Sequence, residues 1–159
     1  MQQLFKKWQK YIMEIKNKPQ AAVAVIINDN DEFLLLKRAN WTGKFPGLWN
    51  LPGGGVDEGE TPLKAAIRET KEESGLHIEI NEENKIHTTN LKDITIHFYT
   101  CRNYSGKIDE GRFKETEKQD PEHEHTKFKW VSPNELDYYQ TIPGTENVIR
   151  KAFGTRDIL

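Results

Sequence analysis

Residues 53–76 constrain the fold more than any other part of the chain, because they join a glycine triplet to a well-marked helix. The segment reads GGGVDEGETPLKAAIRETKEESGL. Thr61 is suited to cap a helix N-terminus, and Pro62 fits the first helical position, where its missing N–H costs nothing. Gly75 fits the left-handed position that ends many helices. The segment therefore predicts a helix over residues 61–74.

Successive residues of a helix are rotated by about 100°, and this rotation separates the predicted helix into two faces. The face expected to pack on the rest of the protein holds Leu63, Ala66, Ile67, Thr70 and Ser74. The opposite face gathers Arg68, Glu69, Glu72 and Glu73. Glu69 and Glu73 are four residues apart, where like charges repel by roughly 0.2–0.5 kcal/mol. Either this face is simply solvated, or a cation lies among the carboxylates.

The glycine triplet favours a cation. Gly53, Gly54 and Gly55 allow tight backbone conformations and let main-chain carbonyls approach a ligand closely. Magnesium prefers oxygen ligands, which carboxylates and backbone carbonyls supply. Taken singly, the triplet could be a plain turn and the helix face a solvated surface. Together they predict a site for a hard divalent cation.

The same segment resembles the Nudix box, the signature of a family of hydrolases. The matching residues are Gly54, Glu60, Arg68, Glu69, Glu72, Glu73, Gly75 and Leu76. Thr70 departs from the motif, because the family usually has an aliphatic residue there. The resemblance extends over roughly residues 20–153 and implies an α/β fold, a Nudix-type α/β/α sandwich with a mixed β-sheet. Residues 19–159 would form this Nudix hydrolase domain.

The resemblance also implies a reaction, the Mg²⁺-dependent hydrolysis of a phosphoric anhydride bond in a nucleoside diphosphate linked to another group. Mn²⁺ is expected to substitute for Mg²⁺. The metal ligands implied by position are Gly54, Glu69, Glu72 and Glu73. Arg68 would orient the glutamates, and Glu60 would steady the junction between loop and helix. The general base would be Glu69 or a glutamate outside the box.

Glu124, in the stretch PEHEHTKFKW, is the best candidate for a glutamate outside the box. Related sequences often place a metal-facing glutamate just before a strand of this kind, and Glu122 is the second choice. His123 and His125 flank Glu124 and could suggest zinc, but no further Cys or His motif follows at zinc spacing. We therefore expect a solvated pair of histidines, with Glu124 as a catalytic and metal-binding residue.

Substrate classes within the family carry weaker signatures. The proline typical of ADP-ribose hydrolases, the tyrosine typical of dinucleoside polyphosphate hydrolases and the coenzyme A pattern are missing from the expected places. What remains resembles the short MutT-like group, which acts on (deoxy)nucleoside triphosphates. Trp41 could stack on a base and Glu146 and Asn147 could read its edge, while Trp49 fits the core better. ADP-ribose, nucleotide sugars and dinucleoside polyphosphates stay open as substrates, and the intact box favours an enzyme over a non-catalytic nucleotide-binding regulator.

The composition fits one globular domain that binds a small-molecule nucleotide. The 159 residues carry a formal net charge of −2, unlike the basic surface that nucleic-acid polymers require. The single cysteine, Cys101, excludes an internal disulfide and fits a reducing compartment, so we expect a cytoplasmic protein. No segment resembles a signal peptide or a membrane-spanning helix, and we expect no membrane partner.

Residues 1–18 predict an additional N-terminal amphipathic helix. Its apolar stripe consists of Leu4, Phe5, Trp8, Tyr11, Ile12 and Ile15. This is too much apolar surface to leave in water, so we expect the helix to pack on the core or on a partner subunit of a homodimer. Apolar runs predict strands over residues 21–28, 32–38, 86–90, 93–103 and 125–132, and a C-terminal helix over residues 144–154. Residues 105–122 are charged and irregular, as in a long loop or a strand with a mobile arm.

Overall fold

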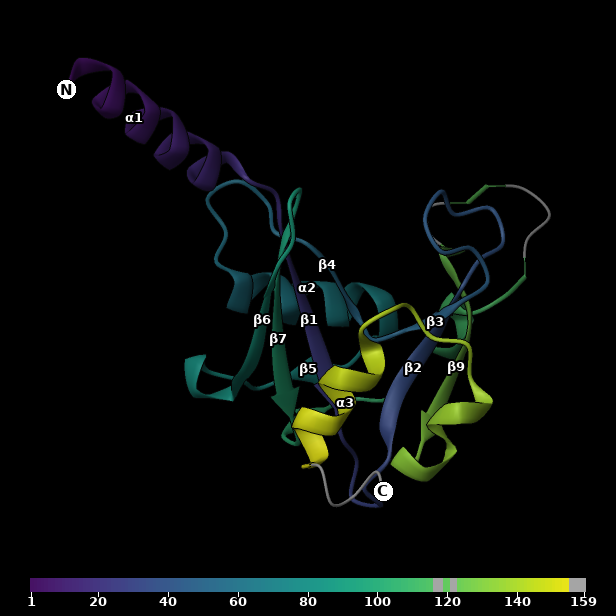
Figure 1. Cartoon of the computed structure of the whole chain (residues 1–159). Helices are drawn as coiled ribbons and strands as arrows, with labels where there is room; N and C mark the ends of the chain where they lie inside the picture. Colours follow the sequence, from purple (N-terminus) through teal and green to yellow (C-terminus); the bar gives the residue numbers. More distant parts are fainter. Residues whose placement is uncertain (116–118, 121–122, 155–159) are drawn as a thin grey trace.

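The computed structural model describes residues 1–115, 119–120 and 123–154 of the chain (Figure 1). Its α-helices are α1 (Gln2–Asn17), α2 (Pro62–Ser74) and α3 (Thr145–Phe153). Its strands are β1 (Gln20–Ile26), β2 (Phe33–Arg38), β3 (Trp49–Asn50), β4 (Gly53–Gly55), β5 (His77–Ile78), β6 (Lys85–Asn90), β7 (Thr95–Cys101), β8 (Tyr104–Ser105) and β9 (His125–Val131). Short 3₁₀ turns include η1 (Glu82–Asn84), η2 (Glu110–Arg112) and η4 (Pro133–Tyr138).

β1 lies inside a four-stranded sheet with the strand order β4-β1-β7-β6. It runs parallel to β7 and antiparallel to β4, so the sheet is mixed, as predicted. A second sheet with the order β3-β2-β9 is antiparallel, and β5 pairs with β8. Parallel strands cannot be joined by a tight turn, and the chain between β1 and β7 accordingly passes through β2 and α2.

Apolar clusters lie on both faces of β1, which explains why its sequence is apolar almost throughout. The cluster on the α3 side contains Val25, Phe33, Leu35, Val148 and Ile149. The cluster on the α2 side contains Ala22, Ala65, Ala66 and Tyr99. Because residues on a strand alternate between its faces, Ala22 and Val25 point to opposite sides. The strands are thus covered by helices on both sides, which is the predicted α/β/α sandwich.

The ends of α2 form as its sequence predicts. The side chain of Thr61 accepts a hydrogen bond from the backbone N–H of Lys64 at 3.2 Å, and Pro62 follows it in the first turn. At the other end Gly75 has a left-handed φ of 85°, and its N–H donates to the carbonyl of Lys71 at 2.9 Å. These two caps fix where the acidic face of the helix begins and ends.

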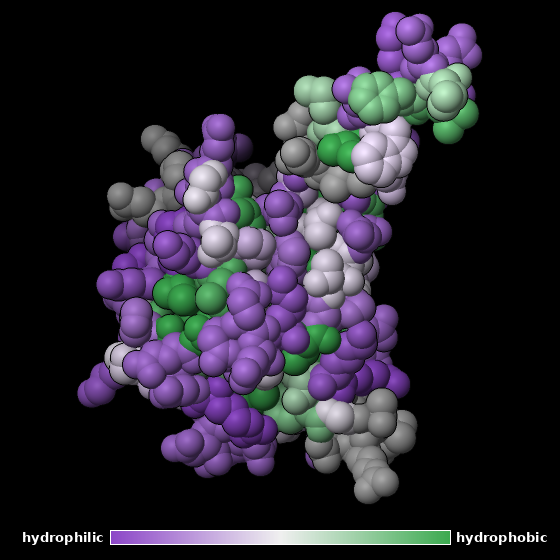
Figure 2. Space-filling model, turned by 90° about the vertical axis from the view of Figure 1, so that its left-hand side faces the viewer, coloured by the Kyte–Doolittle hydropathy of each residue, from purple (hydrophilic) through white to green (hydrophobic). Residues whose placement is uncertain are grey.

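α1 projects away from the body of the molecule, as Figures 1 and 2 show. Leu4, Phe5, Trp8 and Tyr11 each expose between 59% and 75% of their surface. The structure does not show packing on the chain's own core, one of the two predicted arrangements. The physical reason is that α2 and α3 already cover the two faces of the sheets. The other arrangement, packing on a partner subunit, stays a prediction.

Candidate active site

Arg68 connects the carboxylates on the acidic face of α2. Its Nη1 donates to Glu69 Oε1 at 2.9 Å and to Glu72 Oε2 at 3.2 Å. Its Nε and Nη2 donate to the two oxygens of Glu60 at 2.8 and 2.9 Å, and Nη2 also donates to the carbonyl of Gly55 at 2.9 Å. One guanidinium thus satisfies three carboxylates, and it holds two of them on the helix face that the sequence predicts to be functional.

Glu60 ties the turn ahead of α2 to this arginine. Its Oε1 also accepts the backbone N–H of Asp57 at 3.1 Å. The hydrogen bonds from Arg68, followed by the one from Asp57, lower the pKa of Glu60 from 4.5 to about 2. These are the contacts that the predicted steadying role of Glu60 requires, because they bind the charged form of the carboxylate at the junction.

The glycine triplet forms strand β4 instead of the expected loop. It pairs with β1 at the edge of the sheet and lies against α2. The N–H of Gly53 donates to Glu73 Oε1 at 3.3 Å. A Cβ on Gly54 would lie only 2.5 Å from the carboxylate carbon of Glu69. The sheet edge can approach the glutamates this closely only because these positions lack side chains.

Glu73 and His125 form a buried polar pair. His125 Nε2 lies 3.6 Å from Glu73 Oε2, and the two side chains are only 6% and 10% exposed. In the described part of the chain, neither of these two atoms has a hydrogen-bond partner. Burial lowers the pKa of His125 from 6.5 to about 4, so this histidine is neutral near pH 7. The expectation of a solvated histidine is wrong here, since the first residue of β9 points into the protein.

Burial also raises the pKa of the two neighbouring glutamates. It raises the pKa of Glu73 well above its usual value, and the negative charges of Glu69 and Glu124 act in the same direction. Burial likewise raises the pKa of Glu69, although the hydrogen bond from Arg68 opposes the rise. A carboxylate that is buried and faces other carboxylates is stabilised by a cation. This electrostatic arrangement therefore favours binding of a positive charge.

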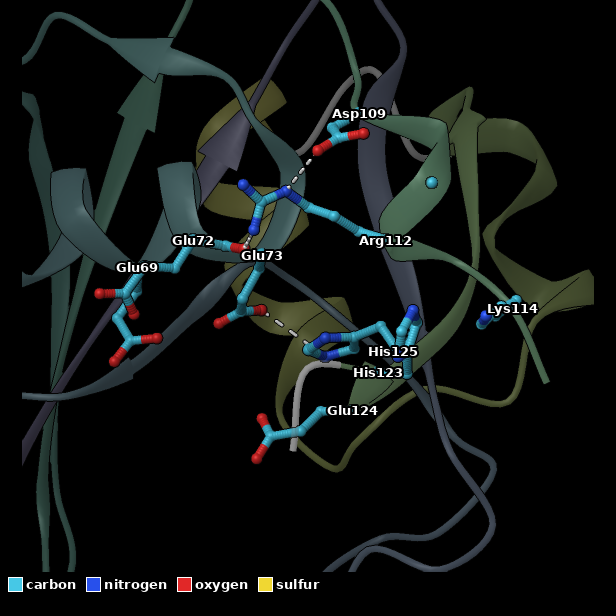
Figure 3. A pocket seen from close by; sticks show the side chains of 10 residues that line it. Glu69, Glu72, Glu73, Asp109, Arg112, Lys114, His123, Glu124 and His125 are labelled. Atoms are coloured by element: carbon cyan, nitrogen blue, oxygen red, sulfur yellow. Dashed lines mark hydrogen bonds and ion pairs between the residues drawn. The ribbon is translucent and has the colours of Figure 1, made fainter. Parts of the chain in front are cut away.

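These glutamates line a cleft of about 970 Å³ between α2, the start of β9 and the segment around η2 (Figure 3). The described residues that line it are Glu69, Glu72, Glu73, Asp109, Gly111, Arg112, Lys114, His123, Glu124 and His125. Arg112 donates from Nε to Asp109 Oδ2 at 3.0 Å and from Nη1 to the backbone carbonyl of Glu72. Arg112 thus borders the acidic cleft beside α2, and Lys114 is a second cationic residue of the lining.

The sequence did not predict the contribution of this segment. Asp109, Arg112 and Lys114 belong to a charged stretch without helical or strand periodicity, so no pattern could place it over α2. Its position is fixed by backbone contacts, because the N–H of Asp109 donates to the carbonyl of Ser74 at 2.9 Å. The role of His125 was also missed, since the alternation of β9 alone does not show what lies opposite its first residue.

Glu124 lies at the cleft, with its carboxylate on the same side as that of Glu73 (Figure 3). Its backbone carbonyl accepts the N–H of Ala39 at 2.7 Å, so the main chain is held in place just before β9. His123, the residue before it, contacts Asp120 through Nδ1 at 2.7 Å. The alternative candidate, Glu122, lies outside the described residues.

The residues predicted to bind the substrate base are not among those that line this cleft. Trp41 is half-buried, and its indole Nε1 is buried without a hydrogen-bond partner in the described part of the chain. Glu146 and Asn147 are exposed on α3, and Glu146 pairs with Arg150 at 2.6 Å. Their contact with a base stays a prediction. Trp49 packs against the core and meets Tyr139 edge-on, with ring centroids 5.2 Å apart, as expected.

The carboxylate oxygens around the cleft are chemically suited to bind a hard divalent cation. Glu73 Oε2 is a buried acceptor without a hydrogen-bond partner among the described residues, and Glu69 stands in a recess that a Cβ on Gly54 would fill. Among the described residues, however, no three His, Cys, Asp or Glu side chains are already gathered as a set that could hold a metal ion. The carboxylates are drawn toward Arg68 instead, so a bound metal would have to reorient some of them.

Comparison with known proteins assigns this fold and motif to one family. Residues 18–152 match the family model described as the NUDIX domain, so the chain belongs to the Nudix family. Nudix hydrolases generally use divalent metal ions. In the described ranges, no helix combines the length and apolar character needed to cross a membrane.

Several relatives are named as nucleotide hydrolases. The chain is 48% identical over 58 residues to a nucleoside triphosphatase NudI from an Enterobacter species. These residues are 36% of this chain and 41% of that protein, so the match spans less than half of either. It is 28% identical over 138 residues to NudI from Escherichia coli, covering 80% of this chain and 92% of the relative. A structure from a study of MutT from Aliivibrio salmonicida and Vibrio cholerae is similar with a TM-score of 0.67 at 20% identity, covering 86% of this chain and 98% of that one. This last similarity concerns the fold alone.

Proposed function

We propose that the chain is an Mg²⁺-dependent pyrophosphohydrolase of (deoxy)nucleoside triphosphates, in which water cleaves a phosphoric anhydride bond to give a nucleoside monophosphate and pyrophosphate. The single observation that carries this proposal is the buried carboxylate of Glu73 among the glutamates of α2, whose Oε2 has no hydrogen-bond partner in the described part of the chain. Mn²⁺ is expected to replace Mg²⁺. A cytoplasmic location belongs to the same proposal, supported by the one free cysteine, Cys101.

In this proposal the metal would be held by Glu69, Glu72 and Glu73, with the carbonyl of Gly54 and with Glu124. When bound, Mg²⁺ neutralises charge on phosphate oxygens and lowers the pKa of water. Arg68 orients Glu69 and Glu72 through its two charge-assisted hydrogen bonds.

Glu124 is proposed as the residue that accepts the proton of the attacking water. Its backbone is fixed by the hydrogen bond to Ala39, and its carboxylate is exposed at the cleft. A general base must stand within hydrogen-bond reach of the proton that it removes, and an exposed carboxylate on a fixed backbone can meet that requirement.

The names of related proteins support the proposed substrate class. A relative from Bacillus subtilis is named a putative 8-oxo-dGTP diphosphatase and one from Methanocaldococcus jannaschii an ADP-ribose pyrophosphatase. The NudI relative that is covered over most of its length is named a nucleoside triphosphatase. We therefore place nucleoside triphosphates, including oxidised ones, ahead of ADP-ribose as substrates of this chain.

The test is a pyrophosphate- and phosphate-release screen with the purified chain over nucleoside triphosphates, 8-oxo-dGTP, ADP-ribose, nucleotide sugars and dinucleoside polyphosphates. We expect a nucleoside triphosphate to give the highest kcat/KM with Mg²⁺, and activity to vanish in EDTA and return with Mg²⁺ or Mn²⁺. Full turnover in excess chelator would contradict the metal mechanism. Preference for ADP-ribose would contradict the substrate assignment alone.

Glu73→Gln tests the carboxylate that carries the proposal. We expect kcat to fall by about 100-fold or more, because one metal-binding charge is lost. The metal-free variant should melt no lower than the wild type, because Gln resembles the protonated form that burial favours. Glu58→Gln, an exposed glutamate ahead of the helix, is the matched control and should retain full activity. Near-normal turnover of the Glu73 variant would show that this buried carboxylate is not a metal ligand.

A further inference from the structure

The apolar side of α1 is largely exposed in the described part of the chain. Phe5 and Trp8 are each 62% exposed, Leu4 is 75% exposed, and Figure 2 shows the helix standing clear of the body with apolar and hydrophilic residues side by side. An isolated helix of this length is marginally stable in water, and most helices gain their stability by packing an amphipathic face. This helix therefore needs a surface that the body does not supply.

The residues of α1 separate into an apolar arc and a basic face. At about 100° per residue, one arc of roughly 120° contains Leu4, Phe5, Trp8, Tyr11 and Ile12. The opposite face contains Lys6, Lys10 and Met13, and Lys7 borders the arc. Lysines beside an apolar arc can extend their ammonium groups past it while their methylene stems cover apolar surface. The aromatic pair Trp8 and Tyr11 combines an apolar ring with a polar tip, which suits a boundary between water and hydrocarbon.

Charge is distributed unevenly between the helix and the rest of the chain. Residues 1–18 hold five lysines and one glutamate, a formal charge of +4. The whole chain carries −2, so residues 19–159 carry −6. A cationic, amphipathic segment that projects from an anionic body can meet an anionic surface while the body stays at a distance from it. The charges thus complement a negatively charged surface.

A second copy of the chain fits this helix less well. Beyond residue 18, the large apolar side chains that are exposed in the described residues are Phe45, Leu91 and Tyr138, which lie in three separate segments. They offer no apolar surface to match the arc of α1. Pairing two α1 helices would cover both arcs but would bring two segments of charge +4 together. The positive charges of the two helices would repel each other and oppose this pairing.

We propose that α1 lies flat in the headgroup region of an anionic phospholipid bilayer, with Leu4, Phe5 and Trp8 among the acyl chains and the lysines toward the phosphates. A basic amphipathic helix with Trp, Phe and Leu on one side is typical of such interfacial binding. Sixteen residues span about 24 Å, less than a hydrocarbon core of about 30 Å, so the helix lies along the surface. This proposal differs from the sequence-based expectation of no membrane partner, and the experiment below decides between them.

The test is sedimentation of the full-length chain with vesicles. Vesicles of phosphatidylcholine with phosphatidylglycerol are compared with vesicles of phosphatidylcholine alone, at low and high salt. We expect the chain to sediment with the anionic vesicles at low salt and to be released at high salt, because surface charges are screened. Little binding to neutral vesicles is expected. Hydrolase activity should be unchanged by binding, since none of the described lining residues of the cleft belongs to α1.

Two substitutions in one helix provide a matched pair. Trp8→Gln lies on the apolar arc and should lower the partition coefficient for anionic vesicles at least about ten-fold. Met13→Gln changes an equally exposed residue, 63% against 62%, on the basic face and should change it little. Lys6→Gln with Lys10→Gln should lower it about five-fold per lysine and should remove much of the salt dependence.

Three results would overturn the proposal. One is a chain that stays in the supernatant with both kinds of vesicle. A second is equal loss of binding by the Trp8 and Met13 variants. A third is a dimeric mass by light scattering that Trp8→Gln converts to a monomer while vesicles bind neither form. This last result would instead assign the arc to a second copy of the chain.

Discussion

Glu124 is the residue whose proposed role depends most on its surroundings, because it lies outside the motif and is exposed. Glu124→Gln keeps its shape but removes its negative charge. We expect kcat to fall at least ten-fold, about 1.4 kcal/mol of transition-state stabilisation, with KM nearly unchanged. Steady-state kinetics in saturating Mg²⁺ measure both constants.

The control for this substitution is Glu135→Gln, another exposed glutamate, in η4. It should show wild-type kinetics. If Glu124→Gln also behaves as wild type, the general base is a glutamate within the box, with Glu69 the first alternative. The matching prediction for Glu122, that its substitution by Gln costs little, concerns a residue outside the described part of the chain.

Thr70 is the one position where the chain departs from the motif. The structure indicates that this departure lowers the free energy of unfolding. The residue is fully buried, and its hydroxyl has no hydrogen-bond partner in the described part of the chain. A buried, unpaired polar group destabilises a protein by about 1–3 kcal/mol. Thr70→Val keeps the shape and removes the hydroxyl, so it should raise Tm by about 2–4 °C for each kcal/mol of this cost that is removed, without changing turnover.

Thr61→Val is the counterpart of this experiment. The hydroxyl of Thr61 accepts the N–H of Lys64 and caps α2. The same chemical change should therefore lower stability there, by about 1 kcal/mol. Thermal unfolding of both variants measures the contrast. Destabilisation by Thr70→Val would mean that its hydroxyl bonds an ordered water.

At the scale of elements, the turn and helix that carry the glutamates should lose stability in acid through Glu60. Its pKa is lowered from 4.5 to about 2 in the folded protein, first by the hydrogen bond from Arg68. A carboxylate with a depressed pKa contributes stability above its unfolded value and loses it as the pH falls through the folded one. The contribution of Glu60 is thus present above about pH 4.5 and disappears toward pH 2.

Glu60→Gln should accordingly lower Tm most above pH 4.5, and the difference from wild type should shrink as the pH falls toward 2. Thermal melts across this range measure it, with Glu58→Gln as the exposed neighbour that should show no such trend. A difference in Tm that is independent of pH would mean that Arg68 stabilises the junction through its other contacts, such as the one to Gly55.

The sequence predicted α2 almost completely, and it predicted β4 and the segment around η2 poorly. Local signals explain the first result, since Thr61, Pro62 and Gly75 mark the helix ends within a few residues. The glycine triplet gave no strand signal, because glycine is depleted in strands and β4 is extended only through pairing with β1. Arg112 reaches the cleft through tertiary contacts that no local pattern encodes.

At the scale of the whole molecule, the sandwich should not depend on α1. The exposed apolar residues of this helix lie away from the body, so deletion of residues 1–17 should leave Tm and kcat/KM unchanged and abolish binding to anionic vesicles. Thermal unfolding, kinetics and vesicle sedimentation measure the three effects. A large fall in Tm would show that the helix packs on the body after all, as one of the sequence-based expectations had it.

The contacts of Arg68 determine whether the protein must bind its metal before it can fold. Its guanidinium already forms ion pairs with Glu60, Glu69 and Glu72. Because these pairs reduce the repulsion among the three carboxylates, the chain can fold without a bound metal ion. Folding can come first and loading with metal second. Protein synthesised where divalent ions are scarce would then be folded but inactive until a metal ion binds. Activity lost in a chelator should return within the mixing time of added Mg²⁺, with no refolding phase.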